Sequence, residues 1–444
     1  MKNVAMAIGG FDTGGGAGVE SDIKTMEALG VHGVAVVSAL TAQNTQGIRE
    51  VLPVSADFFR REIEAILEDF QVKCIKTGMI YTPEQMKIIH QVLPGNIPVV
   101  VDPVIYAKDG TKLIADVESF KQYVIPKAFV ITPNAIEAEI LSGIKISGLK
   151  DQILASRKIH EMFSVPYVIV KGGHVVAEES VDVLYDGKDN VIFKSRRIEA
   201  KHTHGTGSVF ASAICSMLAQ GHSVENSTRV AKDLLDESIG FGLGIGKGVG
   251  PVDPIASLHR KIDKLKVLED MVKFADFAEN ERKFHMLIPE VQSNLAHSID
   301  PRYVRSLEDV ATYRGRIIRE WGGRVRVGMP AMFGFPTHTA RLLLSVISKG
   351  SRANTLMNIR YDPNIVNSFK KLGYEVFEVD RTKEPEGPEG RTMNWLAEYV
   401  YSTLGKIPNV IFDRGKVGKE AMIRFWTSSI DEMVESLKSV LRDL

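Results

Sequence analysis

Short apolar runs alternate with helix-patterned stretches from the first residues onward, and this alternation limits the folds open to the chain. Nearly all of the runs are bounded by Gly, Pro, Asp or Asn, and their continuous apolar character indicates strands buried on both faces. Strands of this kind separated by helices form a parallel sheet with crossover helices. We expect strands at residues 4–8, 33–40, 74–77, 99–101, 129–131 and 167–170, and helices at 18–29 and 58–67. The sequence predicts an α/β domain with a mostly parallel sheet and helices on both faces.

The remainder of the chain predicts a second, smaller α/β domain. At 444 residues the chain exceeds the roughly 250 to 300 at which one hydrophobic core stops growing. A polar, hairpin-like stretch at 180–197 precedes a helix at 207–219, and clustered Gly and Pro at 248–254 end the first pattern. A second alternation follows, with strands at 323–327, 355–359 and 374–379 and helices at 338–348 and 364–372, and a final block of segments at 395–402, 410–412 and 431–441 closes the chain. We therefore expect domains at 1–258 and 270–444, joined by a connector at 259–269 within a charged helix at 255–280.

Composition excludes several classes of protein. Lys plus Arg and Asp plus Glu both total 55, so the chain as a whole has no field that would attract nucleic acid or an anionic membrane. No apolar run reaches the ~18 to 20 residues of a membrane span, and no cleavable leader pattern precedes the first strand. Cys74 and Cys215 lie far apart in apolar surroundings, which favours free core thiols in a reducing compartment. We expect a cytoplasmic protein.

Two glycine-rich segments are candidate anion sites. The segment at 8–18 follows the first strand and opens a helix, but it fails the G-x-G-x-x-G pattern and lacks the G-K-[ST] of a phosphate loop, so alone it is weak evidence. The stretch His204-Gly205-Thr206-Gly207-Ser208 begins another helix. Successive backbone N–H groups and the positive helix end there would hold a migrating phosphoryl group.

A series of motifs resembles one family. Residues 1–254 carry, in order, Gly14–Gly18 with Asp22–Thr25, Leu40–Gly47, Lys76–Met79, Val101–Val104, Thr132–Asn134 with Glu137 and Glu139, Val170–His174, Asp182–Gly187 and His204–Ser208. This set resembles hydroxymethylpyrimidine and hydroxymethylpyrimidine-phosphate kinases, whose fold is ribokinase-like. The resemblance implies ATP and Mg²⁺ as cofactors, small-molecule substrates and, because kinases of this class often dimerise, a homo-oligomer.

The resemblance also implies roles for individual residues. The pyrimidine would contact Gly10, Asp22, Gln43, Met79 and Val104; the metal would be held by Asp102 and Glu137; the nucleotide would contact Asn134, Lys171 and Asp182; and catalysis would involve Gly205, Thr206, Gly207 and Ser208. The alternatives are that Asp22 caps its helix, that Met79 is core, that Asp102 caps a turn and that Lys171 is a solvated surface lysine.

Ser208 departs from the family pattern, which usually has cysteine there, while the wider ribokinase class uses aspartate as the base. A serine hydroxyl is a poorer proton acceptor than either, so base catalysis by Ser208 is disfavoured. Attack by a neutral hydroxymethyl group benefits from a base, whereas attack by an anionic phosphate needs none. We therefore predict that phosphorylation of the monophosphate is less impaired by the serine at residue 208 than phosphorylation of the alcohol.

The second domain is locally basic. The segment from Arg302 to Arg360 contains ten arginines and one lysine but three acidic residues. This excess of positive charge favours a small anionic ligand. Thr337 is a good N-cap for the helix that begins at His338, and the free N–H groups of this helix, beside Arg324, Arg326 and Arg341, would suit a phosphate or pyrophosphate. A cationic imidazole is disfavoured in a first helical turn, which makes His338 unusual, although an ordinary surface histidine is the alternative.

This domain resembles archaeal-type thiamine-phosphate synthase. The resemblance spans about 270–444 and includes the stretches 357–363, 380–385, 412–415 and 418–420. It implies that hydroxymethylpyrimidine pyrophosphate condenses with hydroxyethylthiazole phosphate, releasing pyrophosphate and forming thiamine monophosphate. Arginines would stabilise the leaving group. We expect His338 and one arginine among Arg316, Arg319, Arg324 and Arg326 to be necessary.

Two other functions stay open. The second domain could be a sensor of thiamine phosphates, although the chain lacks the helix-turn-helix module that accompanies related sensors. The kinase could act on pyridoxal or another vitamin alcohol, which fold alone cannot decide.

Overall fold

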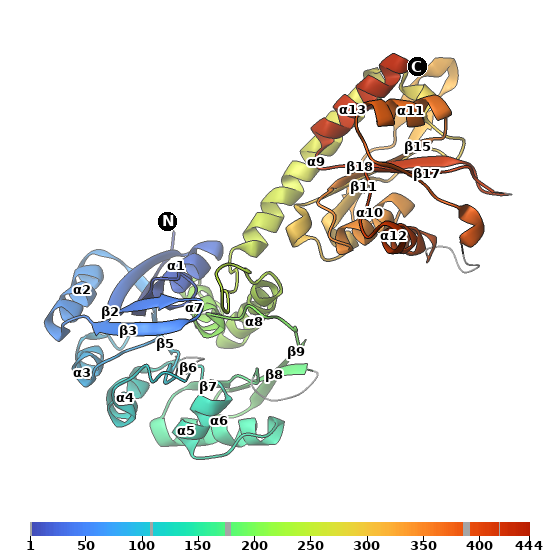
Figure 1. The fold of residues 1–444 in the computed structure, drawn as a ribbon. Helices are drawn as coiled ribbons and strands as arrows, with labels where there is room; N and C mark the ends of the chain where they lie inside the picture. Colours follow the sequence, from blue (N-terminus) through green and yellow to red (C-terminus); the bar gives the residue numbers. More distant parts are fainter. Residues whose placement is uncertain (1, 107–109, 174–178, 385–390, 417) are drawn as a thin grey trace. The chain divides into compact units, whose positions relative to one another are not determined.

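The computed structural model describes residues 2–106, 110–173, 179–384, 391–416 and 418–444 (Figure 1). The chain divides into two compact units, Met1–Leu258 and His259–Leu444. The helix α9 (Ala256–Asn280) includes the expected connector and begins in the last residues of the first unit. His174 and Pro385, which belong to two of the motifs quoted above, lie outside the described residues.

The first unit is built on one nine-stranded sheet of order β3-β2-β1-β4-β5-β6-β7-β8-β9. In this order, the neighbouring strands β2-β1-β4-β5-β6-β7 pair in parallel. The antiparallel strand β3 lies at one edge, and the antiparallel strands β8 and β9 lie at the other. The strands are β1 (Val4–Asp12), β2 (His32–Asn44), β3 (Gly47–Pro53), β4 (Val72–Thr77), β5 (Val99–Val101), β6 (Val130–Ile131), β7 (Tyr167–Val170), β8 (Glu179–Tyr185) and β9 (Asn190–Arg196). The expected mostly parallel sheet is confirmed.

Helices cover both faces of this sheet, as predicted. Alternate residues of a strand point to opposite faces, so Met6 and Ile8 of β1 enter one core while Ala5 and Ala7 enter the other. The first core is covered by α2 (Ala56–Asp69), α3 (Pro83–Val92), α4 (Val117–Tyr123), α5 (Ala135–Ser142) and α6 (Leu149–Phe163), and the second by α1 (Gly18–Ala28), α7 (Thr206–Ala219) and α8 (Val224–Gly240). The small alanines let α1 and α7 approach the sheet closely, which brings the N-terminal ends of both helices near the carboxyl end of β1.

The second unit has a mixed sheet of order β14-β11-β10-β15-β18-β17-β16. Only β16 and β17 pair in parallel; the other neighbours are antiparallel. Its strands are β10 (Leu295–Ser298), β11 (Val310–Tyr313), β14 (Ala331–Phe333), β15 (Thr355–Arg360), β16 (Val376–Glu378), β17 (Val410–Asp413) and β18 (Met422–Thr427), and β12 (Ile317–Arg319) with β13 (Val325–Val327) forms a separate two-stranded sheet. The helices that follow α9 are α10 (His338–Ser348), α11 (Pro363–Lys371), α12 (Arg391–Leu404) and α13 (Ile430–Asp443).

This second α/β region was predicted from the sequence, but part of its sheet was not. β10, β11, β14 and β18 were not predicted, and they account for most of the antiparallel pairing. Three of them span only three or four residues, which is too short for a period of two to be recognised. The helix at 338–348 and its cap are confirmed, since the Thr337 side chain accepts a hydrogen bond from the Ala340 N–H.

Cys74 and Cys215 are both free and buried, as predicted. Within the described ranges, every helix is too short or too polar to cross a membrane.

A buried phenol fixes α9 to the sheet of the second unit. Tyr313 on β11 is fully buried and donates a 2.6 Å hydrogen bond to the Met271 carbonyl of α9. We predict that Tyr313→Phe lowers the free energy of unfolding of the second unit by about 1–2 kcal/mol, because a buried hydrogen bond is lost. Urea denaturation followed by tryptophan fluorescence measures this selectively, since Trp321, Trp395 and Trp426 all lie in this unit. Tyr401→Phe, at a ring that is 38% exposed, is the control and should change stability by less than about 0.5 kcal/mol.

Candidate functional site

The N-terminal turn of α7 packs directly against the first glycine-rich segment. Gly205 precedes the helix with φ +86°, and a Cβ there would come 1.8 Å from the Gly16 carbonyl oxygen, so the approach requires glycine. Among the residues that the structure describes, no side chain caps this helix end. A Cβ on Gly207 would lie 3.1 Å from Asp102 Oδ2 and 3.7 Å from Lys171 Nζ. The turn therefore leaves backbone N–H groups uncapped next to a carboxylate and an ammonium group.

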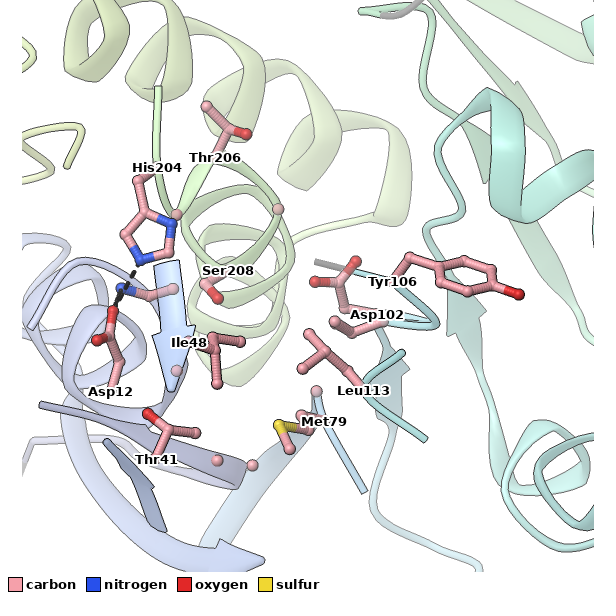
Figure 2. Close-up of a pocket in the computed structure, with 18 of the residues that line it drawn as sticks. Asp12, Thr41, Ile48, Met79, Asp102, Tyr106, Leu113, His204, Thr206 and Ser208 are labelled. Carbon is pink, nitrogen blue, oxygen red and sulfur yellow. Dashed lines mark hydrogen bonds and ion pairs between the residues drawn. The ribbon is translucent and has the colours of Figure 1, made fainter. Parts of the chain in front are cut away.

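A cavity of about 530 Å³ opens in front of this turn (Figure 2). Its walls come from the carboxyl ends of the parallel strands and from both glycine-rich segments, as expected for an α/β sheet. The predicted residues that line it are Gly10, Gln43, Met79, Asp102, Val104, Asn134, Glu137, Lys171, Gly205, Thr206, Gly207 and Ser208. The structure brings twelve predicted residues together in this one space.

One side of this cavity is an apolar slot. Met79, Val104, Leu113 and Ile48 contribute to it, and Leu113, Ile48 and Met79 are labelled in Figure 2. A Cβ on Gly10 would come 2.9 Å from Met79 Sδ, so a side chain at residue 10 would fill the slot. A slot of this kind suits a flat, weakly polar ring.

Lys171 lies between two buried carboxylates. Its Nζ is 3.1 Å from Asp102 Oδ1, and Glu137 interacts with both groups electrostatically. Burial would lower the pKa of Lys171, but the two carboxylates outweigh it and raise the pKa. Burial raises the pKa of Glu137 to about 8, an effect that Lys171 opposes and Asp102 reinforces. Two carboxylates thus share one ammonium group, and a further cation would be stabilised here.

This arrangement fits a divalent cation that is bound together with a phosphate. Asp102 Oδ2 points toward the α7 turn, whereas Glu137 Oε2 accepts a 2.8 Å hydrogen bond from the Asn134 N–H. Among the described residues, no cluster of three or more His, Cys, Asp or Glu side chains could hold a metal unaided. A cation at Asp102 would need most of its oxygen ligands from phosphate and water, as Mg²⁺ commonly does.

A second cavity of about 420 Å³ shares Asn134, Lys171, Thr206 and Gly207 with the first. Asp182, predicted for the nucleotide pocket, lines it, and the Asp182 carboxylate accepts hydrogen bonds from the Gly172 N–H at 2.9 Å and Lys232 Nζ at 2.7 Å. The remaining lining comes from Gly173, Ser180, 196–200, Thr203, Phe210, Lys232, Leu235, Asp236 and Ile239. The two cavities therefore meet at the α7 turn.

Asp12 and His204 were not predicted as site residues, yet they connect the two glycine-rich segments. Asp12 Oδ2 lies 2.8 Å from His204 Nε2, and the Asp12 carboxylate also accepts hydrogen bonds from the N–H groups of Gly14, Gly16 and Ala17. Burial raises the pKa of Asp12, but these hydrogen bonds outweigh it and lower the pKa overall. The Gln43 amide lies 3.1 Å from the same imidazole nitrogen. Asp12 could have been predicted from the sequence, because it is a carboxylate at the end of a strand, directly before several glycines.

The structure corrects the role of Asp22. This residue is fully buried within α1, does not line the cavity, and is therefore neither a helix cap nor a direct contact for the pyrimidine. Its carboxylate accepts hydrogen bonds from Lys76 Nζ at 2.8 and 2.9 Å and from Ser212 Oγ at 2.6 Å. Burial raises the pKa of Asp22 against the opposing effect of Lys76. Lys76 itself lines the cavity, so the ion pair connects Asp22 to the cavity wall.

The predicted residues of the second unit lie on separate elements. Arg324 directly precedes β13 and Arg326 lies on it, and both side chains are exposed; Arg326 Nη1 is 4.0 Å from Glu320 Oε1. His338 is the exposed first residue of α10, and Arg341 is half-buried one turn later. Their joint action stays a prediction.

The fold and the joined cavities are those of a kinase for small molecules. Residues 12–253 match the family described as phosphomethylpyrimidine kinase, and residues 270–439 match the family described as thiamine-phosphate synthase ThiN. The chain belongs to the phosphomethylpyrimidine kinase family and carries a thiamine-phosphate synthase domain behind the kinase domain, the arrangement of bifunctional proteins of thiamine biosynthesis.

Individual relatives agree with this assignment. The chain is 38% identical over 257 residues to a hydroxymethylpyrimidine/phosphomethylpyrimidine kinase of Bacillus subtilis, covering 57% of this chain and 94% of the relative. It is 28% identical over 448 residues to the bifunctional thiamine biosynthesis protein ThiDN of Methanocaldococcus jannaschii, covering 98% of both. A solved pyridoxal kinase of Staphylococcus aureus in complex with AMP-PCP and pyridoxal is 31% identical, with a TM-score of 0.53 over 57% of this chain and 94% of that chain.

The buried ion pair of Asp22 and Lys76 leads to a prediction about stability. Lys76→Met leaves the Asp22 carboxylate buried without its counter-ion and should lower the free energy of unfolding of the first unit by about 3–5 kcal/mol. Adding Asp22→Leu should recover much of this loss, because an apolar pair no longer contains a buried charge. Hydrogen exchange of peptides from β1 and β4 measures both effects. Arg229→Met, at an exposed ion pair with Glu225, is the control and should change little; a single Lys76→Met variant as stable as wild type would contradict the account.

Proposed function

We propose that the first unit uses ATP and Mg²⁺ to phosphorylate hydroxymethylpyrimidine phosphate, and hydroxymethylpyrimidine itself, yielding the pyrophosphate. The observation that carries the proposal is the meeting of two cavities at Asn134, Lys171, Thr206 and Gly207. The cavity with the apolar slot would take the pyrimidine, and the other would take the nucleotide. The terminal phosphate would then lie at the uncapped N–H groups of α7, where charge develops during transfer.

The residues around this turn have separable tasks. The N–H groups at 205–208 would bind the phosphoryl oxygens, and Lys171 would balance charge as the phosphoryl group moves toward the acceptor. Asp102, directly, and Glu137, through water, would hold Mg²⁺, which supplies charge neutralisation on the polyphosphate. Asp12 and His204 would keep the two glycine-rich segments in contact, and Gln43, next to His204, would orient the pyrimidine.

Ser208 makes the two phosphorylations unequal. It lines the pyrimidine cavity and is 9% exposed, so it lies where a base would act, but a hydroxyl is a weak base. We predict that the wild-type enzyme turns over the monophosphate faster than the alcohol, and that Ser208→Ala changes the monophosphate rate by less than about tenfold, since general-base catalysis contributes about 10²–10⁴. Steady-state rates with both substrates test this. Equal wild-type rates, with Ser208→Ala losing only the alcohol reaction, would show that Ser208 does transfer a proton.

Pyridoxal is a second candidate acceptor for the first unit. The observation that favours it is the likeness to solved pyridoxal kinases at 30–31% identity with TM-scores of 0.53–0.54. Comparing ATP turnover with hydroxymethylpyrimidine, its phosphate and pyridoxal discriminates between the substrates; faster turnover of pyridoxal would replace the pyrimidine assignment.

We propose that the second unit condenses hydroxymethylpyrimidine pyrophosphate with hydroxyethylthiazole phosphate. Departure of pyrophosphate leaves positive charge on the pyrimidine methylene carbon, and the thiazole nitrogen forms the new bond to it. The locally basic segment from 302 to 360 supports this proposal, because arginines stabilise an anionic leaving group. A sensor of thiamine phosphates would instead bind thiamine monophosphate without forming it.

A one-pot reaction tests both proposals together. Full-length protein with ATP, Mg²⁺, hydroxymethylpyrimidine phosphate and hydroxyethylthiazole phosphate should produce thiamine monophosphate. Lys171→Met should abolish the pyrophosphorylated intermediate, whereas His338→Ala should accumulate it. Mixing the two variants should restore product if the intermediate diffuses between molecules. Accumulation of the intermediate by the wild-type protein, with thiamine monophosphate bound but never formed, would favour the sensor.

A further inference from the structure

Two charged segments of the second unit meet at one end of its sheet. Asp380–Glu384 follows β16, and Asp413–Lys416 begins at the last residue of β17; these two strands are parallel neighbours, so their carboxyl ends lie together. Arg424 of β18 reaches the same place, since β18 pairs with β17. Both segments carry the resemblance to the synthase family, but neither contains the residues predicted above for catalysis.

The centre of this cluster is buried. Asp413 is fully buried, and its Oδ2 accepts a 2.8 Å hydrogen bond from Arg424 Nη1. Arg381 is 6% exposed, with Nε 3.8 Å from Asp413 Oδ1 and 3.5 Å from Glu384 Oε2. The carboxylates therefore hold the Arg381 guanidinium from two sides, at ion-pair distances longer than a good hydrogen bond.

Among the described residues of the cluster, cations outnumber carboxylates. Lys419 Nζ lies 2.7 Å and Lys416 Nζ 3.5 Å from Glu384, so four cations, Arg381, Arg424, Lys416 and Lys419, face the two carboxylates of Glu384 and Asp413. Among the described neighbours, Arg414 pairs with Glu378, so this pair leaves the charge of the cluster unchanged. Within the described chain, Arg381 Nε and Nη1 are buried donors without a hydrogen-bond partner. A buried guanidinium group with unused donors is costly unless an acceptor is supplied.

Backbone hydrogen bonds hold the two lysines close to each other. Lys416 and Lys419 exchange backbone hydrogen bonds of 3.0 and 2.7 Å, and a Cβ on Gly415, at φ +73°, would come 2.6 Å from the Lys419 carbonyl oxygen. Glu420 holds the turn by accepting hydrogen bonds from the N–H groups of Glu290 and Val291, both at 3.0 Å. The Lys416 and Lys419 side chains are 37% and 39% exposed, so they are open to a ligand.

An aromatic pair lies next to the cluster. Tyr361, directly after β15, stacks on Phe412 with centroids 5.5 Å apart and an angle of 20° between the rings. Phe412 precedes Asp413, and the phenol of Tyr361 interacts electrostatically with Arg414. A flat ring attached to a phosphate could therefore contact aromatic and cationic groups at the same time.

We propose that Arg381, Lys416 and Lys419 bind the phosphate or pyrophosphate group of a phosphorylated heteroaromatic substrate of the second unit. Glu384 and Asp413 are positioning residues that orient Arg381, and Arg424 neutralises Asp413. The ligand oxygens supply the acceptors that Arg381 lacks and balance the excess positive charge, with the bidentate geometry that guanidinium groups favour. The proposal rests on the proposed synthase function for the identity of the substrate, but not for the presence of an anion site.

The test uses inorganic pyrophosphate as the probe and the full-length protein. In the wild type, pyrophosphate should inhibit condensation and slow hydrogen exchange in peptides from β17 and β18. Lys419→Met and Lys416→Met should each raise the inhibition constant about tenfold or more, the loss expected for a charge-assisted contact, and should weaken the protection. Kinase rates should not change. Lys406→Met is the matched control, because Lys406 is an exposed lysine, also 2.7 Å from a carboxylate, that of Glu375.

The outcomes separate this site from the proposed function. A wild-type protein without condensation activity, but with pyrophosphate protection that Lys419→Met removes, would keep the anion site and overturn the synthase proposal. An active wild type whose lysine variants retain both the inhibition constant and the protection would overturn the site. Arg381→Lys is an additional variant that keeps the positive charge. Unchanged tryptophan fluorescence would show that this variant folds. A folded Arg381→Lys protein should bind pyrophosphate more weakly than the wild type.

Discussion

The first unit depends on the direct contact between two glycine-rich backbones, at Gly16 and Gly205. Because a Cβ at Gly205 would overlap the Gly16 carbonyl, the chain can bring the N-terminal end of α7 against the carboxyl end of β1 only with glycine there. Asp12 then ties both segments through backbone N–H groups and His204. This contact leaves the α7 turn facing Asp102 and Lys171, and the two cavities follow from it.

Electrostatics explains why this place suits phosphoryl transfer. The two buried carboxylates Asp102 and Glu137 have one ammonium group, Lys171, beside them, so an additional cation is favoured there. The N-terminal end of α7 next to them carries a partial positive charge and favours an anion. A phosphate with a divalent cation satisfies both needs together. The cluster in the second unit has the opposite imbalance, with four cations and two carboxylates. An anion alone would satisfy it, which fits a reaction whose leaving group is pyrophosphate.

The sequence predicted the first unit well because buried parallel strands are continuous apolar runs such as Val99–Val101, and both segments of the glycine contact were recognised from motifs. Prediction from the sequence failed for side chains whose interaction partners lie far away along the chain. The ion pair between Asp22 and Lys76 spans 54 residues, so a polar residue that matched a motif was assigned to the ligand instead of to another side chain. In the second unit, strands such as Ala331–Phe333 are too short to show a period, and the pairing of Glu384 with Lys419 depends on the β16–β17 register, which no local pattern encodes.

The most direct test of the account is a crystal structure of the full-length protein with a non-hydrolysable ATP analogue and Mg²⁺. The account predicts that the terminal phosphate lies within hydrogen-bond distance of the N–H groups at 205–208, that Lys171 contacts it, and that Asp102 contacts the metal. A triphosphate bound elsewhere, with the turn at Gly205 empty or blocked, would contradict it.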